Sequence, residues 1–364
     1  MPLNTRFTLL LTTLAIVVIG GIGGLIAKQI GLPLPYMLGS LLTTSVITVT
    51  MPRAIPEGYK APELFRAIFI GLIGLSIGSR VTLEVLLSLR HALPSFVALT
   101  LLVPLMQWSN FQVFRRVGGY DRPTAFFSGT PGGLVEAMLM GEQSGADARL
   151  VTMQQFLRII FVVTLLPVGL SIYYGHPLGS AGGMSLAAKG GGLGHLPELA
   201  LLMIIGVALG RVAALPAGQL VGPLLIGAIA TLTGLVQIEM PGWMLSLAQI
   251  VIGSTLGARF HGMNGALILR GAGLAFLSVG SMLLIGCGFA ALVHPLTGEP
   301  FDVLLISFSP GGVTEMALIA LSLQANPAFV SVHHIYRILL TVLMMTLSFK
   351  HLRITKSPGS EPGD

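Results

Sequence analysis

Long apolar stretches separated by short polar segments run along almost the whole of this 364-residue chain. A transmembrane helix needs about 20 predominantly apolar residues, and ten stretches approach or reach that length. They lie at residues 7–27, 34–50, 64–78, 93–113, 151–173, 196–212, 220–236, 244–258, 274–293 and 329–347. This pattern predicts an all-α polytopic membrane protein with about ten transmembrane helices.

Two further apolar segments, residues 124–140 and 303–323, contain the same motif, Pro-Gly-Gly-x-x-Glu. The motif occupies residues 131–136 in the first segment and 310–315 in the second. Proline removes a backbone donor and clashes with the preceding helical turn, and the glycines that follow permit irregular backbone angles. Each segment is therefore predicted to be a broken helix that either re-enters or crosses the membrane.

The motif belongs to an internal duplication. Two glycines and an arginine recur at the same offset as the two motifs: Gly74 with Gly253, Gly78 with Gly257 and Arg80 with Arg259. Upstream, residues 35–39 match residues 223–227 at a larger offset, 188 instead of 179. The duplication predicts two membrane repeats (7–175 and 196–349), a connecting loop (176–195) and a polar tail (350–364).

The distribution of Lys and Arg predicts how the two halves are oriented. Setting aside Arg66, Arg158 and Arg337, which lie within or at the edge of apolar segments, leaves 17 of the 20 positive residues. If the broken segments re-enter, these divide thirteen inside to four outside, and if they cross, ten to seven. The positive-inside rule favours the first arrangement, with inverted repeats and both termini in the cytoplasm. A full crossing, with another span misjudged, is the alternative.

Composition supports the membrane class and argues against others. Hydrophobic residues make up 53% of the chain and charged residues 9%, whereas soluble domains contain about 25% charged residues. The net charge of +6 comes without a basic stripe carrying interleaved aromatic residues, so no nucleic-acid partner is expected. Cys287 is the single cysteine, which excludes an intramolecular disulfide. The expected partners are membrane lipid and a small-molecule or ion substrate, with a homo-oligomer left open and no cofactor or metal predicted.

The candidate site consists of the two broken segments and the polar residues that follow them. Backbone N–H groups after each proline point out of the positive end of a half-helix, which suits an anion, and serines can satisfy freed backbone groups. The candidate substrate- or ion-binding residues of the first half are Ser128, Pro131, Gly132, Gly133, Glu136, Gln154, Gln155 and Arg158. Those of the second half are Ser309, Pro310, Gly311, Gly312, Glu315, His333, His334 and Arg337.

The ionisable members of this set have two interpretations each. Glu136 and Glu315 either carry a proton or cation, or are neutralised by the arginines in purely structural pairs. Arg158 and Arg337 either grip an anionic substrate bidentately or snorkel to the interface. His334 is a candidate proton relay.

The first motif and the residues after it resemble a known family. The sequence Gly-Ala-Asp-Ala-Arg-Leu-Val at 145–151, leading into Gln154 or Gln155 and Arg158, is similar to that of the bacterial AbrB-duplication membrane family, and the likeness extends over residues 15–349. The second copy has Asn326-Pro327 where the first has Asp147-Ala148. This family is distinct from the small DNA-binding regulator that shares its name, and its architecture is similar to that of cation/proton antiporters and anion transporters.

These observations lead to one favoured function and two alternatives. We expect a secondary transporter of the bacterial inner membrane, not an enzyme, that moves a small solute, with an anion favoured and proton coupling a secondary expectation. The first alternative is a membrane protein that affects gene expression indirectly. The second, an ammonia monooxygenase, is disfavoured because only His333 and His334 lie well inside a span, and adjacent helical residues point about 100° apart.

Overall fold

The computed structural model describes residues 3–83, 92–176, 196–215, 217–235, 240–263, 265–323 and 325–353. All regular secondary structure in these ranges is helical. The predicted polar tail and connecting loop lie almost entirely outside the described residues. Each of the ten predicted spans falls on a helix, which confirms the all-α prediction.

The helices of the two halves follow each other in the same order. The first half contains α1 (Leu3–Gln29), α2 (Pro35–Thr50), α3 (Glu63–Gly78), α5 (Leu93–Gln112), α6 (Arg122–Ser128), α7 (Leu134–Gln143) and α8 (Ala148–Tyr174). The second contains α9 (Leu196–Val212), α10 (Gly218–Leu232), α11 (Gly242–Gly257), α12 (Gly265–Thr297), α13 (Phe301–Phe308), α14 (Val313–Ser322) and α15 (Pro327–Arg353). A π-helical turn, η3 (Val113–Val117), extends α5, and a 3-10 turn, η6 (Ala258–Phe260), extends α11.

Five of the described helices are long and apolar enough to cross a membrane, namely α1, α5 with η3, α8, α12 and α15. The other five predicted spans are helices of 15 to 17 residues. At 1.5 Å per residue they reach roughly 25 Å, somewhat less than a hydrocarbon core of about 30 Å. The protein is therefore a polytopic membrane protein, and the count of ten spans stays a prediction.

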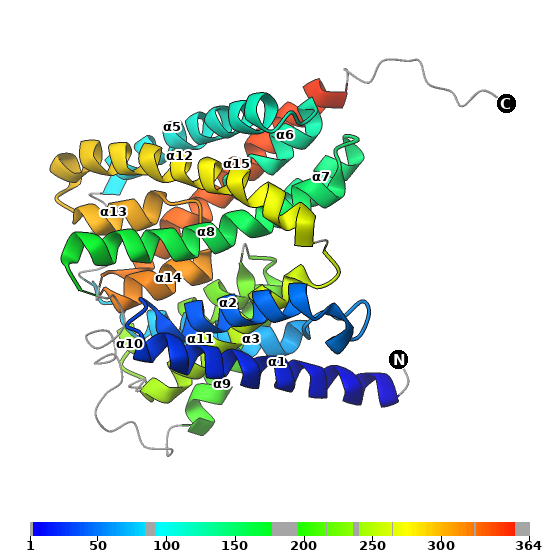
Figure 1. Ribbon diagram of the computed structural model, residues 1–364. Coiled ribbons are helices and arrows are strands. Elements are labelled where there is room, and N and C mark those ends of the chain that lie inside the picture. The colour runs from blue at the N-terminus through cyan, green and yellow to red at the C-terminus, as the bar shows by residue number, and fades with distance from the viewer. Residues whose placement is uncertain are drawn as a thin grey trace.

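The helices form two bundles that lie side by side (Figure 1). We call α1–α3 with α9–α11 the first bundle, and α5–α8 with α12–α15 the second bundle. Within the first bundle the repeats interlock, since α2 packs along α11 and α3 packs along α10. Each bundle therefore contains equivalent parts of both repeats.

Each broken segment folds back on itself as a pair of short helices. Helices α6 and α7 form one hairpin and α13 and α14 the other, and Figure 1 shows them entering the second bundle from opposite ends. Helix α1 begins and α15 ends on the same side of the molecule in this view. The arrangement agrees with the predicted re-entrant segments and inverted repeats.

Glycines allow the helices of the first bundle to touch backbone to backbone. A Cβ atom at Gly74 or Gly78 in α3 would collide with the carbonyl oxygen of Leu220 or Leu224 in α10. Gly253 in α11 is equally tight against the Met37 carbonyl and Ser40 of α2. These glycines are therefore packing positions, where the absence of a side chain lets two helices approach closely.

The structure corrects the predicted alignment upstream of α3. Leu34 and Ala217 both have left-handed backbone angles immediately before α2 and α10, which gives an offset of 183 (217 − 34). Gly23 packs against Gly39 as Gly206 packs against Gly222, at the same offset (206 − 23). The predicted offset of 188 is therefore wrong. It relied on a short stretch in which a proline and a glycine coincide, whereas the left-handed turn before each helix shows which residues are equivalent.

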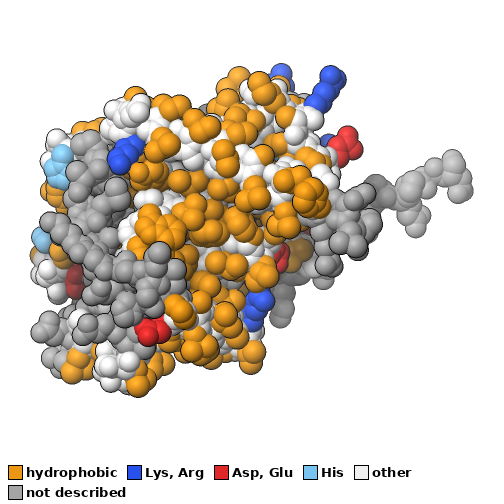
Figure 2. All heavy atoms as spheres, turned by 90° about the horizontal axis from the view of Figure 1, so that it is seen from below, with side chains coloured by type: hydrophobic (Ala, Val, Ile, Leu, Met, Phe, Trp, Pro, Cys, Tyr) orange, Lys and Arg blue, Asp and Glu red, His pale blue; other side chains and the backbone are white. Residues whose placement is uncertain are grey.

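The outer surface matches an apolar surrounding. Figure 2 shows hydrophobic side chains spread over the face seen from below, with few charged side chains, mainly toward its two ends. Large side chains that are more than half exposed include Leu14, Val18 and Ile22 of α1 and Leu284 of α12. Such a surface is expected of helices that contact lipid.

Candidate functional site

The tips of the two hairpins meet the long helices α8 and α15 inside the second bundle. Ser128, Pro131, Gly132, Pro310 and Gly311 are buried there. Each hairpin begins with a short half-helix, α6 or α13, whose last carbonyl groups have no helical partner because the chain breaks at the proline. Buried carbonyls of this kind need donors from elsewhere in the structure.

Two equivalent side chains supply the first donor in each half. Gln155 Nε2 donates to the Phe127 carbonyl at 2.7 Å and to Thr130 Oγ1 at 2.8 Å. His334, the equivalent of Gln155, places Nε2 at 3.0 Å from the Ile306 carbonyl. Since Ile306 is the equivalent of Phe127 in the second repeat, the same contact is made twice.

Two equivalent arginines supply the second donor. Arg158 donates to the Thr130 carbonyl, and Arg337 donates to the carbonyls of Ser309 and Gly311. Both side chains are almost fully buried, with 5% and 1% of their surface exposed. They do not reach the interface, so of the two interpretations the snorkelling one is wrong. Their charge faces the negative ends of the half-helices.

Arg337 also approaches the first hairpin, since its Nε would lie 3.8 Å from a Cβ added at Gly132. Arg158 Nε and Arg337 Nε are buried without a hydrogen-bond partner in the described part of the chain. Burying a cation costs several kcal/mol unless it is compensated, and here the compensation comes from carbonyl dipoles. The centre of the second bundle therefore carries a positive charge that favours a nearby anion.

Glu136 and Glu315 lie in the first turn of the resumed half-helices, α7 and α14. The Glu315 carboxylate lies against Gly312, as shown by the collision that a Cβ at Gly312 would make with it. Glu136 Oε2 would lie 3.4 Å from a Cβ at Gly133. Both carboxylates thus sit at the positive end of a half-helix, where a negative charge is stabilised. Within the described residues neither forms an ion pair with an arginine, contrary to the structural-pair interpretation.

The two motifs share the Pro-Gly-Gly-x-x-Glu pattern but differ in backbone conformation. Gly133 is left-handed, with φ of 62°, whereas Gly312 is extended, with φ of −76° and ψ of 151°. A side chain at Gly133 would be strained by the backbone and crowded by Met345, whose Cε would lie 2.8 Å from the added Cβ. The site is therefore asymmetric although the repeats are alike.

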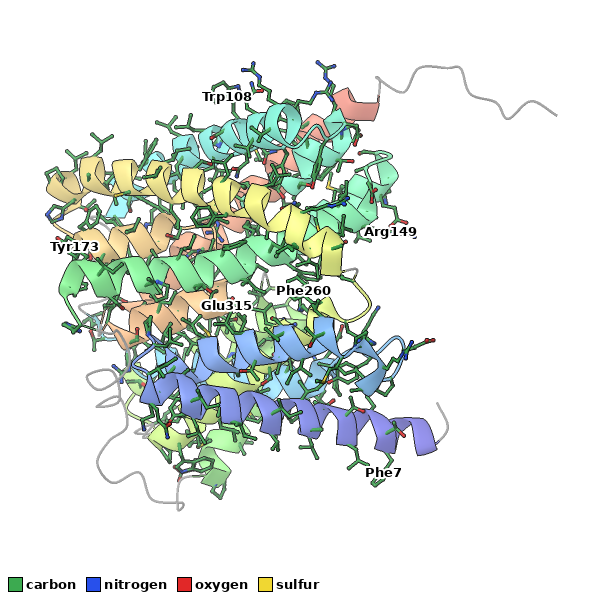
Figure 3. The ribbon with its side chains drawn as sticks, in the orientation of Figure 1. Phe7, Trp108, Arg149, Tyr173, Phe260 and Glu315 are labelled. Atoms are coloured by element: carbon green, nitrogen blue, oxygen red, sulfur yellow. The ribbon has the colours of Figure 1, made fainter. Side chains whose placement is uncertain are left out.

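A cavity of about 300 Å³ lies on the second-hairpin side, between the two bundles. The second bundle contributes Leu134, Val135, Ile159, Gly312, Val313, Thr314, Glu315 and Ile338. The first bundle contributes Arg66, Ile70, Ala217, Ile252, Thr255, Leu256 and Arg259. Figure 3 shows Glu315 and Phe260 at this boundary, while Arg149 and Tyr173 lie at the two ends of α8.

Some predicted site residues point elsewhere. Gln154 Nε2 donates to the Tyr120 hydroxyl at 3.0 Å, and burial raises the pKa of that hydroxyl, which keeps it neutral. His333 lies within hydrogen-bond distance of Ser95 Oγ, at 2.7 Å, and stacks on the rings of Phe96 and Phe329. These two side chains link helices rather than line the cavity.

Two hydroxyl groups near the tips differ in their bonding. Ser309 Oγ donates to the Leu305 carbonyl of its own half-helix at 2.6 Å. Ser128 Oγ is buried without a partner in the described part of the chain. Ser309 thus satisfies a carbonyl in the last turn of α13, while the Ser128 hydroxyl is available to bind another group.

The departure at Asn326 preserves a structural role. Asp147 accepts hydrogen bonds from the backbone N–H groups of Arg149 and Leu150, capping α8. Asn326 Oδ1 accepts from the Phe329 N–H at 3.1 Å at the start of α15. Both residues are effective N-caps. The two halves therefore share the helix cap at this position and not the negative charge.

Sequence reasoning missed Arg66 and Arg259 as site residues. Arg259 was recognised only as part of the repeat, and Arg66 only as a residue at the edge of a span. The sequence feature that could have indicated them is an arginine at the edge of an apolar span, because a cation there is costly and often functional. Within the described residues no group of three or more His, Cys, Asp or Glu side chains is placed to hold a metal ion.

Comparison with known proteins identifies the family. The model of a family described as "AbrB: Transition state regulatory protein AbrB" matches residues 48–353. The chain belongs to the AbrB family. This result confirms the resemblance drawn from the first motif and the residues that follow it.

Two relatives of this AbrB-family chain align with most of its length. One is "Uncharacterized protein YhjN" of Bacillus subtilis (strain 168), with 26% identity over 354 residues and 92% of each chain covered. The other is "Putative regulator AbrB" of Escherichia coli (strain K12), with 25% identity over 296 residues, covering 81% of this chain and 82% of the relative. Both alignments extend over most of this chain and most of the relative.

Proposed function

We propose that this protein is a secondary transporter or permease for a small anionic solute. The observation that carries the proposal is the meeting of two broken hairpins from opposite ends of the molecule beside a partly enclosed cavity. Interrupted helices at the interface of inverted repeats are characteristic of substrate sites in transporters. The buried arginines and the N-termini of α7 and α14 favour a negatively charged solute.

The position of this site between two bundles is compatible with alternating access. The cavity is bounded by both bundles, so a small movement of one against the other would change which side of the membrane it faces. The backbone difference between Gly133 and Gly312 supports a structure that faces one side only. We place the protein in the bacterial inner membrane with both termini in the cytoplasm, on the basis of the positive-inside rule.

Replacing Glu315 by glutamine is expected to reduce transport about tenfold or more. Glutamine keeps the shape of the side chain but cannot ionise, and tenfold in rate corresponds to only about 1.4 kcal/mol. Proteoliposomes on a solid-supported membrane would be challenged with acetate, butyrate, succinate, phosphate and ammonium while the current is recorded. Glu136→Gln tests the equivalent carboxylate, which lies outside the cavity lining.

The matched control is Glu57→Gln, which removes an exposed carboxylate from the loop between α2 and α3. Unchanged currents in both hairpin variants would remove the carboxylates from the mechanism. Correctly folded wild-type protein that moves none of the five solutes would contradict transport of small ions of these classes.

A second candidate function comes from the printed name of the Escherichia coli relative, which describes a regulator. We propose any such effect to be indirect, acting through the solute that is moved. A deletion strain complemented with a transport-deficient Glu315→Gln protein separates the two functions. If that variant restored the wild-type transcript profile, regulation would not depend on transport.

A further inference from the structure

Two arginines from the first bundle face the second hairpin across the cavity. Arg66 comes from α3 and Arg259 from η6, and both line the cavity together with Glu315. Burial lowers the pKa of the Arg259 guanidinium, the nearby Arg66 lowers it further, and Glu315 raises it. In the described part of the chain neither arginine has a carboxylate within ion-pair distance. Arg259 is held in place by Phe156, with its guanidinium carbon 5.2 Å from the ring centroid.

The charges that face the cavity leave a positive excess. Arg66 and Arg259 contribute two positive charges and Glu315 one negative charge. The N-terminal end of α14 also faces the cavity through Gly312 and Val313, and that of α7 through Leu134, which adds partial positive charge. A ligand with one negative charge balances this set, whereas a divalent anion overcompensates it.

Most of the remaining wall is apolar. Ile70, Ile252 and Leu256 line it from the first bundle, and Leu134, Val135 and Ile338 from the second. Inorganic anions would leave this wall in contact with water, while an organic group would bury it at about 25 cal/mol per Å² of apolar surface. A volume of about 300 Å³ is at the lower end for ligand pockets, which fits a small molecule.

The arginine pair is not a feature of the repeat. The equivalent of Arg259 in the first half is Arg80, but the equivalent of Arg66 in the second half is Leu245, at the same offset as the two motifs. Packing common to both repeats therefore does not require Arg66. A second guanidinium on one side of the molecule alone indicates a specific ligand contact there.

We propose that this cavity binds a small monocarboxylate with an apolar body, and that Arg66 and Arg259 bind its carboxylate. The alkyl group then packs between Ile252 of the first bundle and Val135 and Ile338 of the second. This inference rests on the proposed function in that the same cavity is taken as the transport site. It adds the class of the solute and two binding residues.

The test is equilibrium binding to the full chain in lipid nanodiscs, measured by calorimetry. Probes are acetate, butyrate and hexanoate, with butyramide, chloride and succinate as comparisons. We expect saturable binding of butyrate, tighter than acetate, and no binding of butyramide. Arg66→Gln and Arg259→Gln should each weaken butyrate binding about tenfold or more, because charge-assisted hydrogen bonds are lost.

Two control variants distinguish a loss of binding from a loss of folding. Arg53→Gln removes an exposed arginine from the turn that follows α2 and should bind butyrate as the wild type does. Arg66→Lys keeps the charge without the planar fork and should bind with intermediate affinity. Each variant is first shown to melt within a few degrees of the wild type.

Equal binding of butyrate and butyramide, or of butyrate and chloride, would overturn the proposal, as would unchanged affinity in both arginine variants. Flux measurements distinguish this failure from failure of the proposed function. Transport of another solute without butyrate binding would refute only the solute class. Butyrate binding that needs Arg66 and Arg259, without flux of any solute, would support the site and refute transport.

Discussion

Replacing Arg337 by methionine is expected to lower the free energy of unfolding by about 2–5 kcal/mol. Methionine has a similar length but donates no hydrogen bond, so the buried carbonyls of Ser309 and Gly311 lose their donors. Each unsatisfied buried carbonyl costs about 1–3 kcal/mol, and removal of the buried charge offsets only part of the sum. Denaturant titration of the protein in detergent micelles, followed by circular dichroism, measures the difference.

The same substitution should also increase the mobility of the second hairpin, α13 with α14. Without Arg337 the carbonyls of Ser309 and Gly311, between α13 and α14, lose this donor. Gly312 and Glu315, which follow them beside the cavity, should then be held less firmly. Arg337→Lys should fall between the wild type and Arg337→Met, because one ammonium group cannot span both carbonyls as the guanidinium fork does. Arg53→Met, at an exposed position, is the control and should leave stability unchanged. A stable Arg337→Met protein would show that the guanidinium is not needed to hold the hairpin.

Replacing Gly78 by alanine is expected to cost about 3 kcal/mol or more. The added Cβ would collide with the Leu224 carbonyl oxygen and lie 2.8 Å from the Ala228 backbone nitrogen. Backbone atoms cannot rotate away as the end of a side chain does, so α3 and α10 would have to separate. Separation breaks the contact through which the two repeats interlock in the first bundle. Thermal melting monitored by loss of monodisperse protein gives the readout.

Gly280→Ala provides a matched control for this prediction. Gly280 lies inside the long helix α12, and a Cβ there would meet nothing within 4 Å. Alanine favours the helix by up to about 1 kcal/mol relative to glycine, so the control should be as stable as the wild type or more so. Equal stability of Gly78→Ala and Gly280→Ala would contradict the packing role of Gly78.

The broken segments show how far local sequence determined the candidate site. Proline and glycine act on their own backbone, so the interruption at Pro131 and Pro310 could be predicted and was found. The roles of Arg158 and Arg337 could not, because a sequence contains no distance between a guanidinium on one helix and a carbonyl on another. Of the two interpretations of Glu136 and Glu315, the one that paired them with these arginines failed for the same reason.

The sequence by itself determined the membrane class, the helical architecture, the duplication and the positions of the breaks, because each depends on composition, periodicity or the backbone limits of single residues. The tertiary structure alone decided which carbonyls the buried arginines bind and how α2 aligns with α10. It also brought Arg66 and Arg259, which lie in different repeats, to one cavity beside Glu315. Contacts between distant segments arise from the packing of whole helices, and no local pattern specifies which side chains then meet.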